Sequence, residues 1–156
     1  MPLGDLFSVE ERRDSIRRQL IPCRVFKLFC TFTNPPKDKY LLLACTQPRP
    51  LLFIINSEIS EYIKKREHLH KCQVPIHAGD HDFLKHDSYI DCSEARTDFH
   101  LIDIERQVIE DMSRIKGLIT MNVKDEILKA VDATNTISRQ HKKWIAEGLR
   151  TSPPPE

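Results

Sequence analysis

The sequence predicts an α+β fold for three reasons. Short segments rich in β-branched and aromatic residues fill the first two thirds of the chain, whereas apolar residues at helical spacing fill the last third. The length of 156 residues suits one domain that buries a core without disulfide bonds. Neither an internal repeat nor a linker between domains interrupts the pattern. We therefore expect a small sheet that is closed on itself or covered by the terminal helices.

A helix and a strand are expected at the start of the chain. Residues 8–20 (SVEERRDSIRRQL) open with Ser8 and, three positions later, Glu11, which is the pattern of a capping box and predicts a short amphipathic helix. Residues 23–33 (CRVFKLFCTFT) alternate between two faces and are rich in aromatic and β-branched residues, which predicts a strand. Residues 34–39 (NPPKDK) contain paired prolines, so a loop is expected there.

The middle of the chain predicts further strands, interrupted by one short helix. Ser57 begins the segment 57–69 and is a candidate cap for that helix. The strands are expected at residues 40–47, 51–56, 73–78 and 86–96.

The last third predicts two helices. Residues 104–115 carry apolar side chains at helical spacing, and Gly117 is expected to end that helix. A longer helix is expected from Asn122 to Leu149. Residues 150–156, with their run of prolines, are expected to form a disordered tail.

The charge balance excludes a polybasic coat for nucleic acid. Lys and Arg number 24 and Asp and Glu 23, a formal net charge of +1, although a local basic groove is compatible with that total. No apolar run approaches about eighteen residues, and the N-terminus has no apolar core like that of a signal peptide. We expect a cytoplasmic protein without membrane contact. Its five cysteines include no CxxC pair and are expected to be reduced thiols.

The segment 68–100 raises the question of a metal site or a cysteine nucleophile. It holds six of the seven histidines together with Cys72 and Cys92. Neither CxxC pairs nor HExxH occur, so no metal and no cofactor are expected, with a zinc-stabilised domain as the weaker alternative. His86 and Cys92 lie six residues apart, about 20 Å along a strand, and cannot touch directly.

Composition alone favours a plain solvated turn at the PPKDK segment, and any phosphate chemistry there would rest on cations and not on glycines. The four glycines are far apart, which excludes a cradle for a nucleoside triphosphate. Lys37 and Lys39 flank the turn before an apolar strand, and Arg49 lies in the next break. Cations at strand ends stabilise a phosphoryl transition state without a metal.

Residues 74–106 present a recognisable order of features. A strand would end near His77, a charged turn follows, and DSYI at residues 87–90 would form the next strand before ART at 95–97. This order resembles the second half of the PemK/MazF-like toxin family. The segment KDEILKAVDAT at 124–134 is similar to the family's terminal helix.

The first half of the chain contains the positions that, on this resemblance, match the family's catalytic residues. The catalytic arginine falls on Lys39, the loop proline on Tyr40, and the catalytic Thr or Ser on Ser57. A rival register places the Arg-Pro motif on Arg49 and Pro50. Lysine is a departure from the family pattern, because a point charge does not replace the two-pronged guanidinium.

The resemblance implies a small SH3-like β-barrel of about five to seven strands, with C-terminal helices and an additional N-terminal helix. Residues 1–20 would form that N-terminal extension and 21–149 the family domain. The implied function is that of a toxin-like, metal-independent endoribonuclease, in which the ribose 2′-hydroxyl of single-stranded RNA attacks the adjacent phosphate. The implied partners are single-stranded RNA, a cognate antitoxin and a second copy in a homodimer.

Two groups of site residues follow from the resemblance and the charges. Lys39 and Ser57 are the expected catalytic residues. The residues expected to contact RNA are Lys37, Tyr40, Arg49, His77 and His81. The alternative, from a different functional class, is a non-catalytic module of the same fold that binds nucleic acid or protein.

Overall fold

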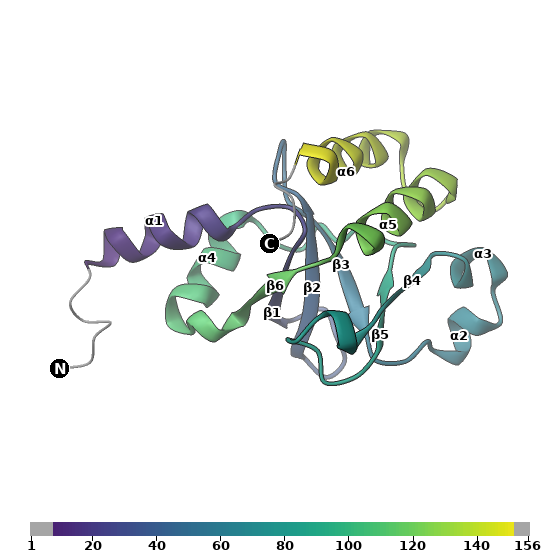
Figure 1. The fold of residues 1–156 in the computed structure, drawn as a ribbon, viewed down its shortest axis with the longest axis horizontal. Coiled ribbons are helices and arrows are strands. Elements are labelled where there is room, and N and C mark those ends of the chain that lie inside the picture. The colour runs from purple at the N-terminus through teal and green to yellow at the C-terminus, as the bar shows by residue number, and fades with distance from the viewer. Residues whose placement is uncertain (1–7, 152–156) are drawn as a thin grey trace.

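The computed structural model describes residues 8–151 and shows an α+β fold, as the sequence predicts. One six-stranded antiparallel sheet, in the order β4-β5-β3-β2-β1-β6, curls into a half-barrel with helices on both faces (Figure 1). The strands are β1 (Arg24–Cys30), β2 (Lys37–Cys45), β3 (Leu51–Asn56), β4 (Gln73–Ile76), β5 (Ser88–Asp91) and β6 (Ile115–Leu118).

The helices range from single turns to thirteen residues. The α-helices are α1 (Val9–Gln19), α2 (Glu61–Lys64), α3 (Glu67–His70), α4 (Leu101–Glu110), α5 (Met121–Ala133) and α6 (Arg139–Thr151). Two single turns of 3-10 helix are η2 (Ala78–Asp80) and η3 (Met112–Arg114). Among the described residues, none of these helices combines the length and the apolar character that crossing a membrane requires.

The central strands bury both faces, so two cores lie on opposite sides of one sheet. In β2, Leu42 and Ala44 point into the core that α5 and α6 complete. Leu41 and Leu43 point into the other core, which contains Ile16 of α1 and residues of α4. Alternate side chains of a strand point to opposite faces, and this explains why the apolar run of β2 is continuous.

The hairpin of β1 and β2 begins earlier than its sequence suggests. A loop was expected over residues 34–39, but β2 starts at Lys37, which pairs with Cys30, and Lys39 pairs with Leu28. The Thr33 hydroxyl accepts a hydrogen bond from the Lys37 amide at 3.1 Å and thereby closes the turn. The expected loop is therefore wrong in its second half. Charged side chains are compatible with a strand whose end is exposed.

Two further segments differ from expectation because side chains break them. The helix expected to reach residue 115 ends at Glu110, and Asp111 accepts a hydrogen bond from the Ser113 amide that starts a new turn. The next residues form β6, so Gly117 lies in a strand instead of ending a helix. The strand expected over 86–96 is only four residues long, β5.

The C-terminal helix is divided, and the short middle helix is capped by another serine than expected. The single helix expected from residue 122 to 149 is interrupted between α5 and α6, where the Thr134 hydroxyl accepts a hydrogen bond from the Thr136 amide. Ser60, and not Ser57, caps α2. Residues 150 and 151 of the expected tail end α6, and 152–156 lie outside the described residues.

Side chains cover the part of β1 that extends beyond β6. The outermost strand, β6, pairs with β1 at Arg24 and Phe26, and beyond these residues the Gln107 side chain accepts from the Phe29 amide at 2.8 Å and donates to the Phe29 carbonyl at 3.3 Å. Arg114 donates to the Lys27 carbonyl at 2.9 Å on the same edge. At the opposite edge, β4 contains Pro75, which has no N–H to offer a further strand.

The five cysteines are free and buried, and we expect them to resist alkylation in the folded protein. Burial raises the pKa of Cys30 and of Cys45 from 9.0 to about 11, so only about one such thiol in 10⁴ is ionised at pH 7. Iodoacetamide with mass spectrometry should show negligible labelling before urea and complete labelling after it. Because the thiol pKa is raised on folding, stability should decline as the pH rises from 9.0 to about 11. Rapid labelling of the native protein at pH 7 would contradict this.

Candidate functional site

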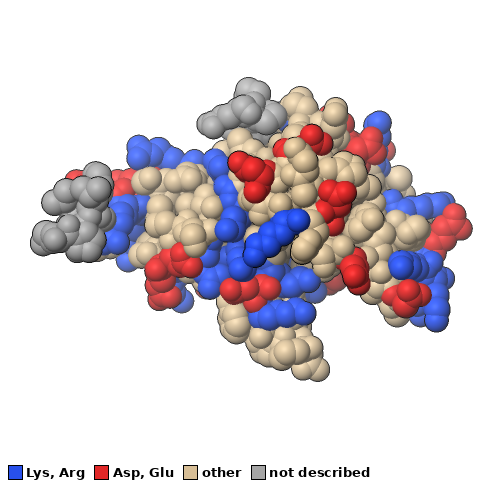
Figure 2. Space-filling model, turned by 60° about the horizontal axis from the view of Figure 1, so that its bottom comes forward, with Lys and Arg blue, Asp and Glu red and all other residues tan. Residues whose placement is uncertain are grey.

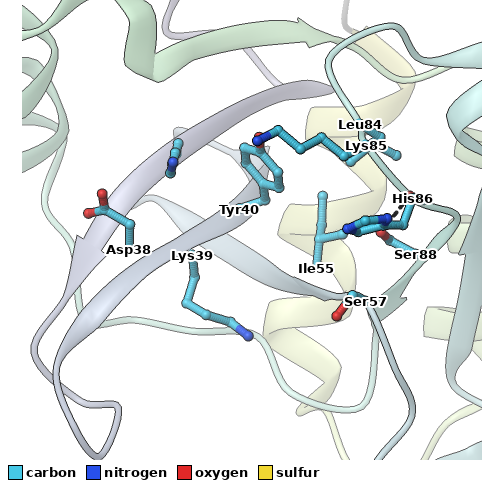
Figure 3. A pocket seen from close by; sticks show the side chains of 10 residues that line it. Asp38, Lys39, Tyr40, Ile55, Ser57, Leu84, Lys85, His86 and Ser88 are labelled. Atoms are coloured by element: carbon cyan, nitrogen blue, oxygen red, sulfur yellow. Dashed lines mark hydrogen bonds between the residues drawn. The ribbon is translucent and has the colours of Figure 1, made fainter.

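A pocket of about 290 Å³ opens where β1, β2 and β3 meet the loop that precedes β5 (Figure 3). Its volume lies near the lower end of the range for small-ligand sites, about 300–1,000 Å³. The pocket is lined by Lys27, Asp38, Lys39, Tyr40, Ile55, Ser57, Leu84, Lys85, His86 and Ser88.

Strand register brings the pocket residues together from distant parts of the chain. Tyr40 pairs with Lys27 on one side and with Ile55 on the other, so the three side chains point to the same face of the sheet. Ser57 lies two positions after Ile55, beyond the end of β3, and also lines this face. The residues thus form one surface because antiparallel neighbours align across the sheet.

Cations dominate the charge of this region. Lys27 and Lys85 are exposed and line the pocket, and the Lys116 ammonium lies 5.9 Å from the centre of the Tyr40 ring. The Asp38 carboxylate is paired with Arg114 at 3.1 Å, which reduces its repulsion of an anion. Figure 2 shows Lys and Arg side chains gathered near the centre of the view, with acidic side chains among them. A local basic surface therefore exists despite the near-neutral total charge.

Hydroxyl groups complete the lining. Ser57 is exposed, and within the described residues no hydrogen bond occupies its hydroxyl. Ser88 is buried and donates to the His86 carbonyl at 2.9 Å, which fixes the backbone before β5. The Tyr40 hydroxyl is 3.5 Å from the Phe83 carbonyl, a long contact that leaves it able to turn to a ligand.

Lys39 borders the pocket, but its side chain points to the opposite face from Tyr40. Its ammonium donates to the Asn56 side-chain oxygen at 2.8 Å, and Figure 3 shows the chain running away from the Tyr40 ring. Burial, with a contribution from Lys37, lowers the pKa of Lys39 below its ordinary value. The two expected catalytic residues, Lys39 and Ser57, both line the pocket, but the Lys39 ammonium is held by Asn56 and points away from the Tyr40 ring.

The other expected RNA contacts lie outside the pocket. Lys37 is exposed at the start of β2, on the same face as Lys39. Arg49, in the turn between β2 and β3, donates to the Thr97 carbonyl at 2.8 Å. His77 is exposed with its ring 3.6 Å from the Asp87 carboxylate, whereas His81 is 3% exposed and belongs to the interior.

Sequence reasoning predicted only three of the pocket residues, Lys39, Tyr40 and Ser57, and the basic residues that it missed are Lys27, Lys85 and His86. Lys27 is the charged residue in the middle of β1. The alternation of the strand predicts which residues share a face with Lys27, but it does not predict which face of the sheet holds the pocket. Lys85 and His86 stand directly before the DSYI segment. Their charge is a signal in the sequence, but only the fold shows that they meet Ser57 and Tyr40.

Metal ligation receives no support from the part of the chain that the structure describes. There, no group of three His, Cys, Asp or Glu side chains is placed to hold an ion. Cys92 is fully buried, and burial raises its pKa well above its ordinary value. A nucleophilic role for Cys92 therefore has no geometric basis.

No protein-family model matches the chain, and no curated protein matches it. The pocket and its chemistry are thus the basis for a functional assignment.

Proposed function

We propose that this protein binds single-stranded RNA in the pocket and cleaves it without a metal, by attack of a ribose 2′-hydroxyl on the adjacent phosphate. The observation that carries the proposal is the combination, in one pocket, of exposed ammonium groups, a free serine hydroxyl and an aromatic ring. The relevant residues are Lys27, Lys85, Ser57 and Tyr40.

Each of these groups matches a need of the reaction. The attack creates a five-coordinate phosphorane with additional negative charge on its oxygens, which ammonium groups and a hydroxyl donor stabilise. Lys27 and Lys85 supply charge and Ser57 supplies the donor. Tyr40 offers a ring on which a base stacks, a contact worth about 1–3 kcal/mol per base and tolerant of sequence.

The curled half-barrel supports a finer proposal about family and partners. We propose that the sheet corresponds to the SH3-like barrel of PemK/MazF-like toxins, that the protein acts in the cytoplasm, and that it pairs with an antitoxin and with a second copy of itself. Support comes from the antiparallel order of β1, β2 and β3 and from Ser57 at the end of β3, which is the position of the family's catalytic Thr or Ser.

The test is incubation of the purified protein with a long single-stranded RNA in EDTA. We expect cleavage to persist in EDTA, and Ser57→Ala to slow it by about 10²-fold, the usual effect of removing one donor to a transition-state oxyanion. Arg49→Ala is the control, because Arg49 is tied to the Thr97 carbonyl, and it should cleave at the wild-type rate. Loss of cleavage in Arg49→Ala would instead favour the rival register.

Lys39→Ala decides how far the active site extends. Its ammonium faces away from Tyr40, so the pocket groups alone should support cleavage and the rate should fall by less than about tenfold. A collapse of the rate comparable with that of Ser57→Ala would mean that the scissile phosphate crosses the strand ends to reach both faces.

A second candidate is a non-catalytic module that binds single-stranded RNA. The observation that favours it is that the Asn56 side chain holds the Lys39 ammonium, which points away from the Tyr40 ring. In that case fluorescence anisotropy with labelled RNA would show salt-dependent binding, weakened in Lys85→Ala, while the RNA stays intact in EDTA.

A further inference from the structure

Three histidines between residues 77 and 86 differ in what their rings do. The His77 ring lies 3.6 Å from the Asp87 carboxylate. The His81 ring uses both nitrogens, since Nδ1 lies 2.9 Å from the His77 carbonyl and Nε2 accepts from the Thr120 amide at 3.2 Å. His86 is exposed, and in the described part of the chain no hydrogen bond or ion pair involves its ring. Of the three, only His86 lines the pocket.

We propose that His86 is the catalytic residue that removes the proton from the attacking 2′-hydroxyl. This inference rests on the proposed ribonuclease function and adds the acid–base group which that function leaves unassigned. Imidazole ionises near neutral pH and exchanges protons readily, which suits it to this role.

The position of His86 in the pocket supports the role. Figure 3 shows its ring on the same side as Ser57 and Ser88, with Ile55 beside it and Lys85 running toward Tyr40. The hydrogen bond from Ser88 to the His86 carbonyl fixes the backbone that carries the ring. A phosphate held between the cations and Ser57 would therefore have an imidazole at its side.

The reaction needs no molecule besides the RNA and a water molecule, which carries a proton and is re-formed at the end. The 2′-oxygen forms a bond to phosphorus as its proton passes to a nitrogen of the His86 ring. The bond from phosphorus to the 5′-oxygen breaks, and that oxygen keeps the electron pair and takes a proton from water. The products are a 2′,3′-cyclic phosphate and a 5′-hydroxyl, and the imidazolium returns its proton to the resulting hydroxide.

The charged groups that line the pocket with His86 suit an anionic substrate. Lys27 and Lys85 are exposed there and supply positive charge for a phosphate. The acidic neighbours are already engaged, because Asp38 pairs with Arg114. The adjacent Asp87 accepts from the Ala78 amide at 2.9 Å and lies beside His77.

Cleavage rates from about pH 5 to 9 test the assignment with a matched pair of variants. His86→Ala should reduce cleavage by about 10²- to 10⁴-fold and lose the acid limb of the rate profile. Free imidazole should restore part of the rate in this variant. His77→Ala, an equally exposed histidine of the same segment outside the pocket, should keep the wild-type rate and profile. Circular dichroism of both variants verifies folding.

The outcomes separate the two proposals. If wild type cleaves RNA but His86→Ala cleaves equally fast, the assignment of His86 is wrong and the ribonuclease function stands. If wild type does not cleave, the ribonuclease function itself is wrong. A second measurement detects binding and does not depend on cleavage. Uridine 3′-monophosphate should shift the His86 imidazole signals in NMR spectra and leave those of His77 in place. No shift of the His86 signals would overturn its position beside the phosphate.

Discussion

Gly148→Leu is expected to lower the free energy of unfolding by about 4 kcal/mol, the largest effect that we predict for a single change. A Cβ atom on Gly148 would meet the Ala44 carbonyl oxygen at 2.6 Å and the Cβ of Cys45 at 2.7 Å. Helix α6 therefore lies directly on the backbone of β2. Any side chain here pushes the helix away and exposes Ile145 and Leu149, which are fully buried.

Gly79→Leu is the matched control, since a Cβ on Gly79 meets no atom within 4 Å and its φ is not positive. Urea denaturation should show little change for this variant and a much lower midpoint for Gly148→Leu. Leucine has a higher helix propensity than glycine by about 1 kcal/mol, so the loss cannot be ascribed to a weaker helix. A Gly148→Leu protein as stable as wild type would disprove the close approach of α6 to β2.

His81→Ala is expected to lower the free energy of unfolding by about 3 kcal/mol. The ring is almost fully buried, packs edge-on against Phe83 at 5.6 Å between centroids, and links the His77 carbonyl to the Thr120 amide. Thr120 is the N-cap of α5, so the ring joins the loop after β4 to the start of a helix. Its removal leaves a cavity and takes away a partner from two backbone groups.

Thermal unfolding of His81→Ala and His77→Ala measures this effect with a control of the same chemistry. His77 is exposed and its ion pair is a surface contact, so its loss should change stability by less than about 0.5 kcal/mol. Equal midpoints for the two variants would show that the His81 ring is not a structural link, and would restore it as a candidate for RNA contact.

Much of the sheet could be predicted from sequence because its strands are marked by composition. β3 spans residues 51–56 as expected, since an apolar run follows a Pro-Arg-Pro break. β6 was missed because Ile115 continues the helical spacing of the residues before it, and apolar periodicity alone does not reveal a local break. The Asp111 side chain makes that break by bonding the Ser113 amide.

The candidate site was predictable only in part. The resemblance led to Ser57 and Tyr40, and the pocket contains both. It also led to Lys39, which was expected in a loop; because β2 begins at Lys37, Lys39 lies within the strand and points to the opposite face from Tyr40. Lys85 and His86 reach the site through a loop whose path depends on the buried ring of His81. Local sequence patterns carry no information about such long-range contacts.

The protected edge of β1 limits how this protein associates with itself. A second copy that added a strand beside β1 would first have to displace the Gln107 amide from Phe29 and the Arg114 guanidinium from the Lys27 carbonyl. Such side-chain covers act as a barrier to runaway growth of sheets between molecules, the route by which exposed strands seed aggregates. The proposed homodimer should therefore not form by the addition of a strand beside the end of β1. At high concentration this part of the sheet should not seed fibrils as long as the Gln107 and Arg114 side chains cover it.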